Sequence, residues 1–79
     1  MSREQPKRLA DLRTERAWSG RYLADRARVA PSTIVRIEAG QPARMGSFLR
    51  IAEALGIEPL AIREYADLRE RQSETTVQE

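Results

Sequence analysis

The chain has 79 residues, and a chain of this length forms a single domain with a small core and little room for an enclosed active site. It contains neither cysteine nor histidine, which excludes disulfides, thiol nucleophiles, imidazole bases and the usual zinc ligands, so we expect no enzyme and no cofactor or metal. No apolar run approaches the roughly 20 residues that span a bilayer, and the N-terminal sequence is charged, so we expect a cytoplasmic protein without a membrane partner.

The net charge of +2 is unevenly distributed along the chain. Residues 1–50 carry 11 basic and 5 acidic side chains, whereas residues 51–79 carry 3 basic and 7 acidic ones, which gives net charges of +6 and −4. A basic first half is the electrostatic pattern of a surface that binds duplex DNA. An ordinary solvated surface of arginine and glutamate is the alternative.

The first predicted helix spans residues 7–16 and follows a polar segment, 1–6, that is expected to be flexible. Leu9 and Leu12 are spaced i, i+3 and therefore face inward. Trp18 is expected to pack beneath the next two helices, because proteins that stack single-stranded bases normally carry several grouped aromatic residues.

Residues 18–40 predict two short helices joined by a tight turn. Ser19 is a good N-cap for the first of them, which ends near Ala27. Its inward face consists of Leu23, Ala24 and Ala27.

Pro31 begins the second of these helices, over residues 31–39, because its fixed φ and missing N–H suit the first helical position. Ile34 and Ile37 are its large inward residues, and Gly40 supplies the left-handed residue that ends it. Two short helices separated by a tight turn match the geometry of a helix-turn-helix.

A fourth helix is expected to begin at Gly46 or Ser47, after a loop of turn-forming residues. It ends at Gly56, which is suited to the left-handed conformation that stops a helix. Its inward stripe repeats at helical spacing and consists of Phe48, Ile51, Ala52 and Leu55.

Pro59 begins a fifth predicted helix, which continues to Arg71. Ile62 and either Tyr65 or Ala66 complete the core. A second apolar stripe on this helix consists of Leu60, Ala61, Tyr65 and Leu68.

From Leu9 to Ile62 the sequence resembles the Xre/Cro/CI family of small helix-turn-helix DNA-binding domains. The residues that carry the resemblance are Leu9, Leu12, Arg13, Trp18, Ser19, Leu23, Ala24, Val29, Ser32, Thr33, Ile34, Ile37, Glu38, Gly40 and the block 49–57 (LRIAEALGI). The resemblance implies an all-α, five-helix fold like that of the lambda repressor, with the helix-turn-helix in helices 2 and 3. We assign the domain to residues 7–71 and expect residues 72–79 to form a flexible tail.

The resemblance also implies a structural ion pair between Arg13 and Glu38, which would connect the first helix to the end of the third. The pair is physically reasonable, since a partly buried carboxylate needs a cation or hydrogen-bond donors beside it.

Base contacts are implied at the start of the third helix, because the second helix of the motif lays its N-terminal residues against the major groove. The expected contacts are Ser32, Thr33, Val35 and Arg36, directly after Pro31. Arg36 can donate two hydrogen bonds to guanine O6 and N7, and a solvated helix arginine is the alternative. The Thr33 hydroxyl can instead bond to its own helix.

Phosphate contacts are expected on both sides of that helix. The candidates are Ser19 with the free N–H groups beside it, Arg21, and Arg44, which resembles the basic residue that approaches the DNA backbone in relatives. Arg26 and Arg28 are interpreted as ordinary surface residues.

Three residues depart from the family pattern and can weaken DNA binding. Gly20 replaces a glutamine that commonly anchors a phosphate, and Ala30 replaces a polar cap worth about 1 kcal/mol. Pro31 replaces a residue that often reads a base.

The sequence is compatible with two functions. The first is a DNA-binding transcriptional regulator, a repressor, that binds a two-fold operator as a homodimer. Its predicted dimer face is the stripe of Leu60, Ala61, Tyr65 and Leu68, for which completing the monomer core is the alternative. The second is a protein-interaction module or antitoxin whose main partner is another protein, such as a toxin or an effector protein.

Overall fold

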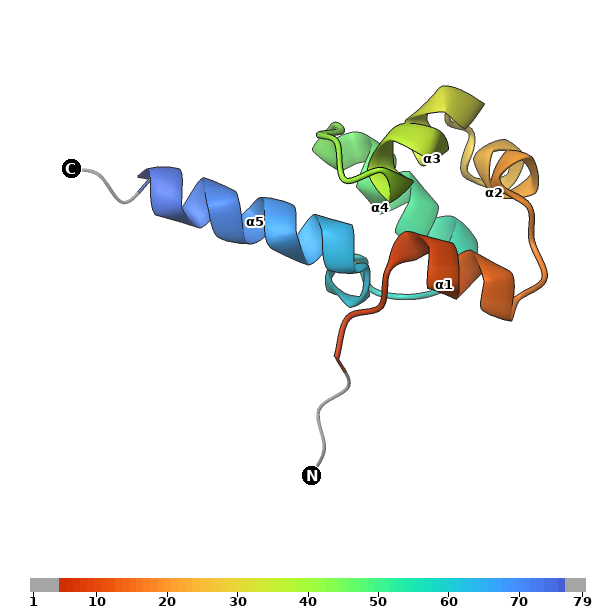
Figure 1. Cartoon of the computed structure of the whole chain (residues 1–79), viewed down its shortest axis with the longest axis horizontal. Helices are drawn as coiled ribbons and strands as arrows, with labels where there is room; N and C mark the ends of the chain where they lie inside the picture. The colour runs from red at the N-terminus through yellow and green to blue at the C-terminus, as the bar shows by residue number, and fades with distance from the viewer. Residues whose placement is uncertain (1–4, 77–79) are drawn as a thin grey trace.

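The computed structural model describes residues 5–76, which fold into five α-helices and one 3₁₀ turn (Figure 1). The helices are α1 (Leu9–Glu15), α2 (Gly20–Ala27), α3 (Pro31–Glu38), α4 (Met45–Leu55) and α5 (Arg63–Thr76), and the 3₁₀ turn η1 (Pro59–Ala61) precedes α5. The predicted all-α, five-helix architecture is therefore confirmed. Residues 1–4 and 77–79, which belong to the predicted flexible ends, lie outside the described residues.

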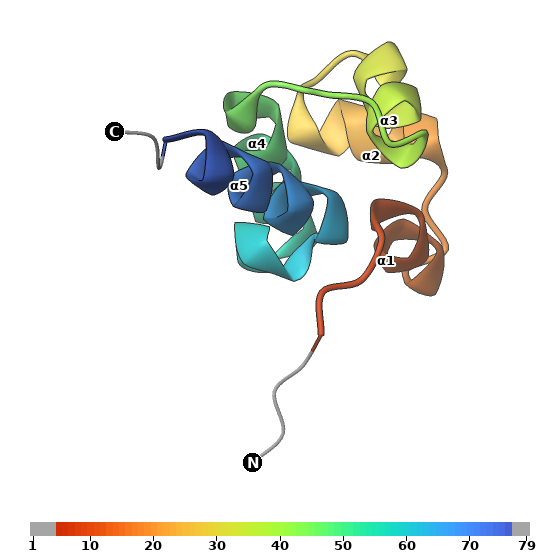
Figure 2. The ribbon, with the colours of Figure 1, turned by 60° about the vertical axis from the view of Figure 1, so that its left-hand side comes forward.

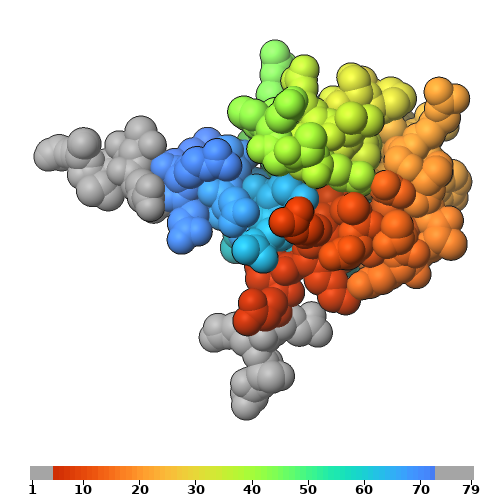
Figure 3. Space-filling model, viewed as in Figure 1, coloured from red at the N-terminus to blue at the C-terminus, as the bar shows by residue number. Residues whose placement is uncertain are grey.

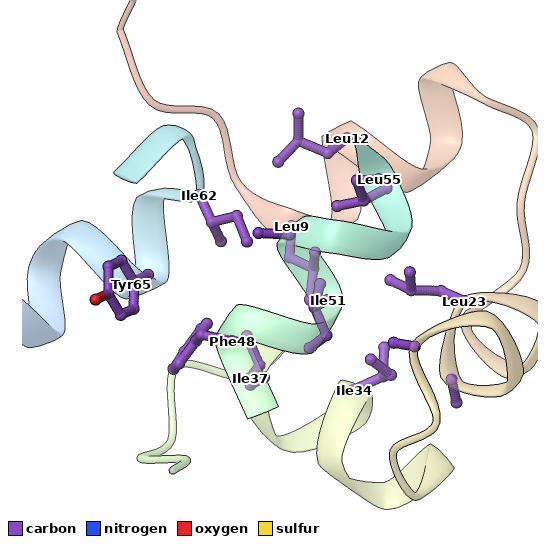
Figure 4. Close-up of a cluster of buried hydrophobic side chains, with 13 residues drawn as sticks. Leu9, Leu12, Leu23, Ile34, Ile37, Phe48, Ile51, Leu55, Ile62 and Tyr65 are labelled. Atoms are coloured by element: carbon purple, nitrogen blue, oxygen red, sulfur yellow. The ribbon is translucent and has the colours of Figure 1, made fainter. Parts of the chain in front are cut away.

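One hydrophobic core draws side chains from all five α-helices and from the link between η1 and α5 (Figure 4). The sequence pattern predicts an inward side chain at each of these positions except the last, which it leaves to Tyr65 or Ala66. Complete burial of a leucine or isoleucine side chain stabilises the fold by about 1.5–3 kcal/mol. The buried residues are Leu9, Leu12, Leu23, Ala24, Ala27, Ile34, Ile37, Phe48, Ile51, Ala52, Leu55, Ile62 and Tyr65.

The start of α1 is joined to the start of α5. The Lys7 N–H donates to the carbonyl of Ala61 at 3.0 Å, and the Arg63 N–H donates to the carbonyl of Lys7 at 2.8 Å. The Leu9 N–H donates to Oε1 of Glu64 at 2.9 Å, which satisfies one of the N–H groups left free at a helix start. Because Lys7 is held in this extended pairing, α1 begins at Leu9 and not at the predicted residue 7.

The helix-turn-helix has the predicted local structure, with α3 packed against α2 (Figure 2). The Tyr22 N–H donates to Oγ of Ser19 at 3.0 Å, so Ser19 is the N-cap of α2. The helix ends at Arg28, which has a left-handed backbone with φ 61°. Pro31 is the first residue of α3, and Gly40 follows that helix with φ 84°.

The last two helices differ from the prediction at their boundaries. Helix α4 begins at Met45 and already includes Gly46 in its first turn. The predicted continuous helix from Pro59 is interrupted, because Ile62 has an extended backbone (φ −92°, ψ 119°) that lets its side chain enter the core. Helix α5 then continues to Thr76, beyond the predicted helix end at Arg71. It points away from the other four helices (Figure 1).

Candidate nucleic-acid interface

The outer side of α3 is open along the positions expected to read bases. Ile34 and Ile37 are buried and fix the inner side of the helix on the core. On the outer side Val35 is 68% exposed, and Ser32 and Arg36 are exposed as well. The space-filling view shows α3 at the surface, with no other segment in front of it (Figure 3). The helix is thus held from behind while its outer side remains accessible.

Arg36 and Thr33 are not engaged by the fold. Among the residues that the structure describes, the Arg36 guanidinium forms no ion pair or hydrogen bond. Thr33 is half-buried, and its hydroxyl makes no hydrogen bond to its own helix within the same range. Both side chains therefore retain their donors for a ligand.

The three expected phosphate-contacting residues are all exposed and lie at helix starts. Ser19 accepts a hydrogen bond from Tyr22, which leaves its hydroxyl proton for another acceptor. Arg21 is the second residue of α2, and Arg44 is the residue before α4. The N–H groups of Met45 and of the α2 start have no partner within their helices, as at every helix N-terminus, and favour an anion.

Arg13 and Glu38 form a bidentate ion pair between α1 and the end of α3. Nε of Arg13 lies 2.7 Å from Oε2 of Glu38, and Nη2 lies 3.0 Å from Oε1. Nη1 donates to the carbonyl of Trp18 at 3.1 Å, so the same guanidinium also holds the chain that enters α2. The hydrogen bonds from Arg13 to Glu38 and the carboxylate charge raise the pKa of the Arg13 guanidinium, while burial opposes this increase. The pair fixes the end of α3 relative to α1.

Trp18 lies at the edge of the core rather than fully beneath both motif helices. It is half-buried, and its ring meets the ring of Tyr22 edge to face, with 5.0 Å between centroids. The Arg26 guanidinium lies 5.6 Å from the Trp18 centroid. The exposed side of Trp18 is thus part of a surface cluster on α2.

The predicted dimer face needs one correction. Tyr65 is only 5% exposed and packs against Phe48, with 5.4 Å between ring centroids, so it belongs to the monomer core. Leu60 is 54% exposed, and Ala61 and Leu68 are half-buried. Because η1 and α5 are separate elements, these residues do not share one helical stripe.

Two contacts between helices were not predicted from the sequence. Glu64 caps α1 from a distant helix, and Arg50 on α4 donates to the carbonyl of Arg28 at 3.3 Å. Neither contact has a local sequence signal, because each depends on the packing of two separate elements. Within the described residues, no helix combines the length and the apolar character that crossing a membrane requires.

Comparison with known protein families agrees with this geometry. A family model described as helix-turn-helix matches residues 9–62, which is more than half of the chain. Comparisons with curated proteins and with solved structures gave no match. The fold and the exposed α3 define a DNA-binding regulator of the helix-turn-helix class. Within this class, the chain belongs to the Xre/Cro/CI family of helix-turn-helix domains.

Proposed function

We propose that this protein is a sequence-specific, double-stranded-DNA-binding repressor that reads the major groove with α3 as a homodimer. The observation that supports the proposal is that one side of α3 is buried in the core while the other is exposed. Two buried isoleucines fix its inner side, and its outer side presents the Arg36 guanidinium, which has no partner in the part of the chain that the structure describes. A helix held in this way can enter the major groove without any rearrangement of the domain.

The base contacts are assigned by side-chain chemistry. Arg36 donates two hydrogen bonds to guanine O6 and N7, which discriminates against other bases by about 1–3 kcal/mol. Ser32 and Thr33 bond to base edges or to phosphates, and Val35 meets a thymine methyl group. With one bidentate side chain on α3, we expect specificity to depend strongly on a single base pair in each half-site.

The phosphate contacts are assigned to Ser19, Arg21 and Arg44. Each lies at or beside the start of a helix, where free N–H groups add to the attraction for an anion. Each phosphate neutralised by an arginine contributes about 0.9 to the slope of log affinity against log salt. Gly20 adds no side chain here, so Arg21 supplies the contact at the start of α2.

The proposed dimer uses the exposed apolar surface at η1 together with Leu68 on α5. Leu60, Ala61 and Leu68 remain from the predicted face, and Ile57 and Leu60 line a shallow hollow beside η1. Two domains joined here would read half-sites about one helical turn apart, roughly 34–36 Å. One module alone has a small interface, so dimerisation is the natural way to reach useful affinity.

The proposal is tested by selecting a binding site from a random duplex library and measuring affinity by fluorescence anisotropy. Arg36→Ala should weaken binding to the selected site by about 5- to 150-fold, the equivalent of one bidentate base contact, and should relax selectivity at one position per half-site. Arg44→Ala should weaken all duplexes about equally and lower the salt slope by about 0.9. Arg26→Ala is the matched control and should change neither the affinity for duplex DNA nor the salt slope. Equal affinity for all duplexes in every variant would contradict the proposal.

A protein-interaction module or antitoxin remains the second candidate, and α5 is the observation that favours it. This helix points away from the other helices, as a segment that meets another protein would (Figure 1). In that case the purified protein should bind no duplex, even at low salt.

A further inference from the structure

A second surface runs from Trp18, beside the start of α2, along that helix to Arg28 and across to Arg50 on α4. We call it the α2 outer patch and define it by Trp18, Tyr22, Arg26, Arg28 and Arg50. Tyr22 is exposed, and the Arg26 guanidinium lies 5.6 Å from the Trp18 centroid and 5.9 Å from the Tyr22 centroid. A guanidinium at these distances is attracted to both ring faces, which holds it in place at the surface.

Beside this cluster the surface is hollowed between the end of α2 and the middle of α4. The hollow is lined by Arg26, Ala27, Arg28, Arg50, Glu53 and Ala54. Nη1 of Arg50 donates to the carbonyl of Arg28 at 3.3 Å, which positions the Arg50 side chain against the end of α2. Arg26 and Arg28 at the end of α2 and Arg50 on α4 therefore border one depression.

The positive charge of this hollow is not compensated by the fold. Among the described residues, none of its three arginines has a carboxylate within 4.0 Å. Glu53 is the only acidic residue that lines the hollow, and Asp25 is the neighbour of Arg26 along α2. Three guanidinium groups against one carboxylate leave an excess of two positive charges, so an anionic ligand would relieve their mutual repulsion.

Arg28, which borders the hollow, has an unusual backbone conformation. Its φ of 61° places it in the left-handed region, which costs a residue with a side chain about 1–2 kcal/mol. Glycine has the same conformation after α3 and α4, at Gly40 and Gly56, whereas Ala17 has it after α1 with φ 60°. Arg28 therefore lines the hollow at a backbone position where glycine would be more stable.

We propose that the α2 outer patch binds an acidic segment of a partner protein. Carboxylates would face the three guanidinium groups, and an apolar or aromatic side chain would pack on the exposed edges of Tyr22 and Trp18. Tryptophan, tyrosine and arginine are the residues most enriched at the energetic centres of protein interfaces. This inference goes beyond DNA binding and does not depend on it.

Two other occupants fit the patch less well. A second copy of this chain would have to offer an acidic element, but residues 63–72 of α5 carry three basic and three acidic side chains. Duplex DNA is assigned to the starts of α2 and α4 and to the outer side of α3. Arg26 lies about 10 Å along α2 from Ser19, and Arg50 lies about 9 Å along α4 from Arg44, by the helical rise per residue. A partner could thus reach the arginine end of the patch while the operator is bound, whereas Trp18 and Tyr22 adjoin the phosphate contacts at the start of α2.

The test uses the full chain and a short, capped oligoglutamate peptide with one central phenylalanine. Trp18 is the only tryptophan, so its fluorescence reports binding at the patch directly. The patch variant combines Arg26→Gln, Arg28→Gln and Arg50→Gln. It should bind the peptide about tenfold more weakly than the wild type, as expected for the loss of several exposed charge pairs. The same peptide made with lysine should not bind.

The matched control variant, Arg21→Gln with Arg36→Gln and Arg44→Gln, removes the same charge from the proposed DNA surface. It should keep the affinity for the peptide and lose duplex binding, whereas the patch variant should keep duplex binding. If both variants bind the peptide more weakly by the same factor, the proposal is overturned, because the attraction is then non-specific.

Two further outcomes would assign the patch to another occupant and so also overturn the proposal. Loss of duplex binding in the patch variant would make it a DNA contact, and loss of dimer in sedimentation equilibrium would make it an interface between copies. If the patch variant unfolds, a ¹⁵N–¹H titration of the wild type decides: peptide-dependent shifts must centre on Tyr22, Arg26 and Arg50. Shifts centred on α3 would refute it.

Discussion

Removal of the Arg13–Glu38 ion pair is expected to destabilise the whole domain, because this pair joins α1, the entry to α2 and the end of α3. The Arg13 guanidinium makes two bonds to the Glu38 carboxylate, at 2.7 and 3.0 Å, and one to the Trp18 carbonyl, at 3.1 Å. The two side chains are only 21% and 19% exposed, so water screens the pair less than it screens a surface pair.

The loss of unfolding free energy on removal of this pair is expected to lie between two known limits. An exposed ion pair contributes about 0–1 kcal/mol, and removal of one partner from a fully buried pair costs about 3–5 kcal/mol. With four-fifths of each side chain covered, we expect Arg13→Met to lower the free energy of unfolding by about 2–3 kcal/mol. For a domain of this size that corresponds to a decrease in Tm of about 10–20 °C.

The assay is urea denaturation followed by Trp18 fluorescence and circular dichroism, for Arg13→Met, Glu38→Gln and the double variant. The double-mutant cycle should give a coupling energy of about 1–2 kcal/mol. Lys7→Met is the control, because its pair with Glu15 is exposed on both sides and should contribute less than about 1 kcal/mol. A coupling below about 0.5 kcal/mol would refute the reasoning, since the pair would then behave like a surface pair.

The raised pKa of Arg13 determines the direction in which stability changes with pH. A group whose pKa is higher in the folded state stabilises the fold fully below its unfolded pKa and loses this contribution only as the pH rises through the folded value. Because arginine already titrates at strongly alkaline pH, the Arg13 guanidinium should produce no pH dependence of stability near neutrality.

Three smaller predictions follow from burial and backbone geometry, each measured by thermal and urea denaturation. Ile62→Ala should lower the free energy of unfolding by about 2–5 kcal/mol because Ile62 is fully buried. Leu60→Ala, at an exposed position, should lower it by less than about 1 kcal/mol, and equal decreases would contradict the assigned core. Arg28→Gly should raise stability by about 0.5–1 kcal/mol because it relieves a left-handed backbone, and a loss would show that the Arg28 side chain contributes to folding. Gly20→Ala should stabilise α2 by about 0.5–1 kcal/mol, because the new Cβ would lie 3.6 Å from Cγ2 of Ile34, an ordinary contact; destabilisation would reveal crowding there.

The sequence predicts the features of this fold that are local. Ser19 as a cap, Gly40 and Gly56 as helix stops, and the spacing of the buried residues all follow from signals within one or two turns of helix. The Arg13–Glu38 contact is implied only by the family resemblance, since no local signal connects residues so far apart.

The features that the sequence does not predict depend on tertiary contacts. The break at Ile62 follows from the pairing of Lys7 with the start of α5, and no property of the segment after Pro59 indicates it. The burial of Tyr65, which was predicted both for the core and for a dimer face, is decided by that break and by the position of Phe48. The meeting of Arg50 with the end of α2 likewise depends on how α4 packs, so an exposed arginine on α4 has no special character in the sequence.

The most direct test of the central claim is methylation interference on the selected duplex, because a methyl group on guanine N7 blocks the major-groove edge that Arg36 is proposed to read. The account predicts that methylation of one guanine in each half-site abolishes wild-type binding and has little effect on the weaker binding of Arg36→Ala. If the same guanine methylation inhibits Arg36→Ala as strongly as the wild type, or inhibits neither protein, α3 does not read the groove through Arg36.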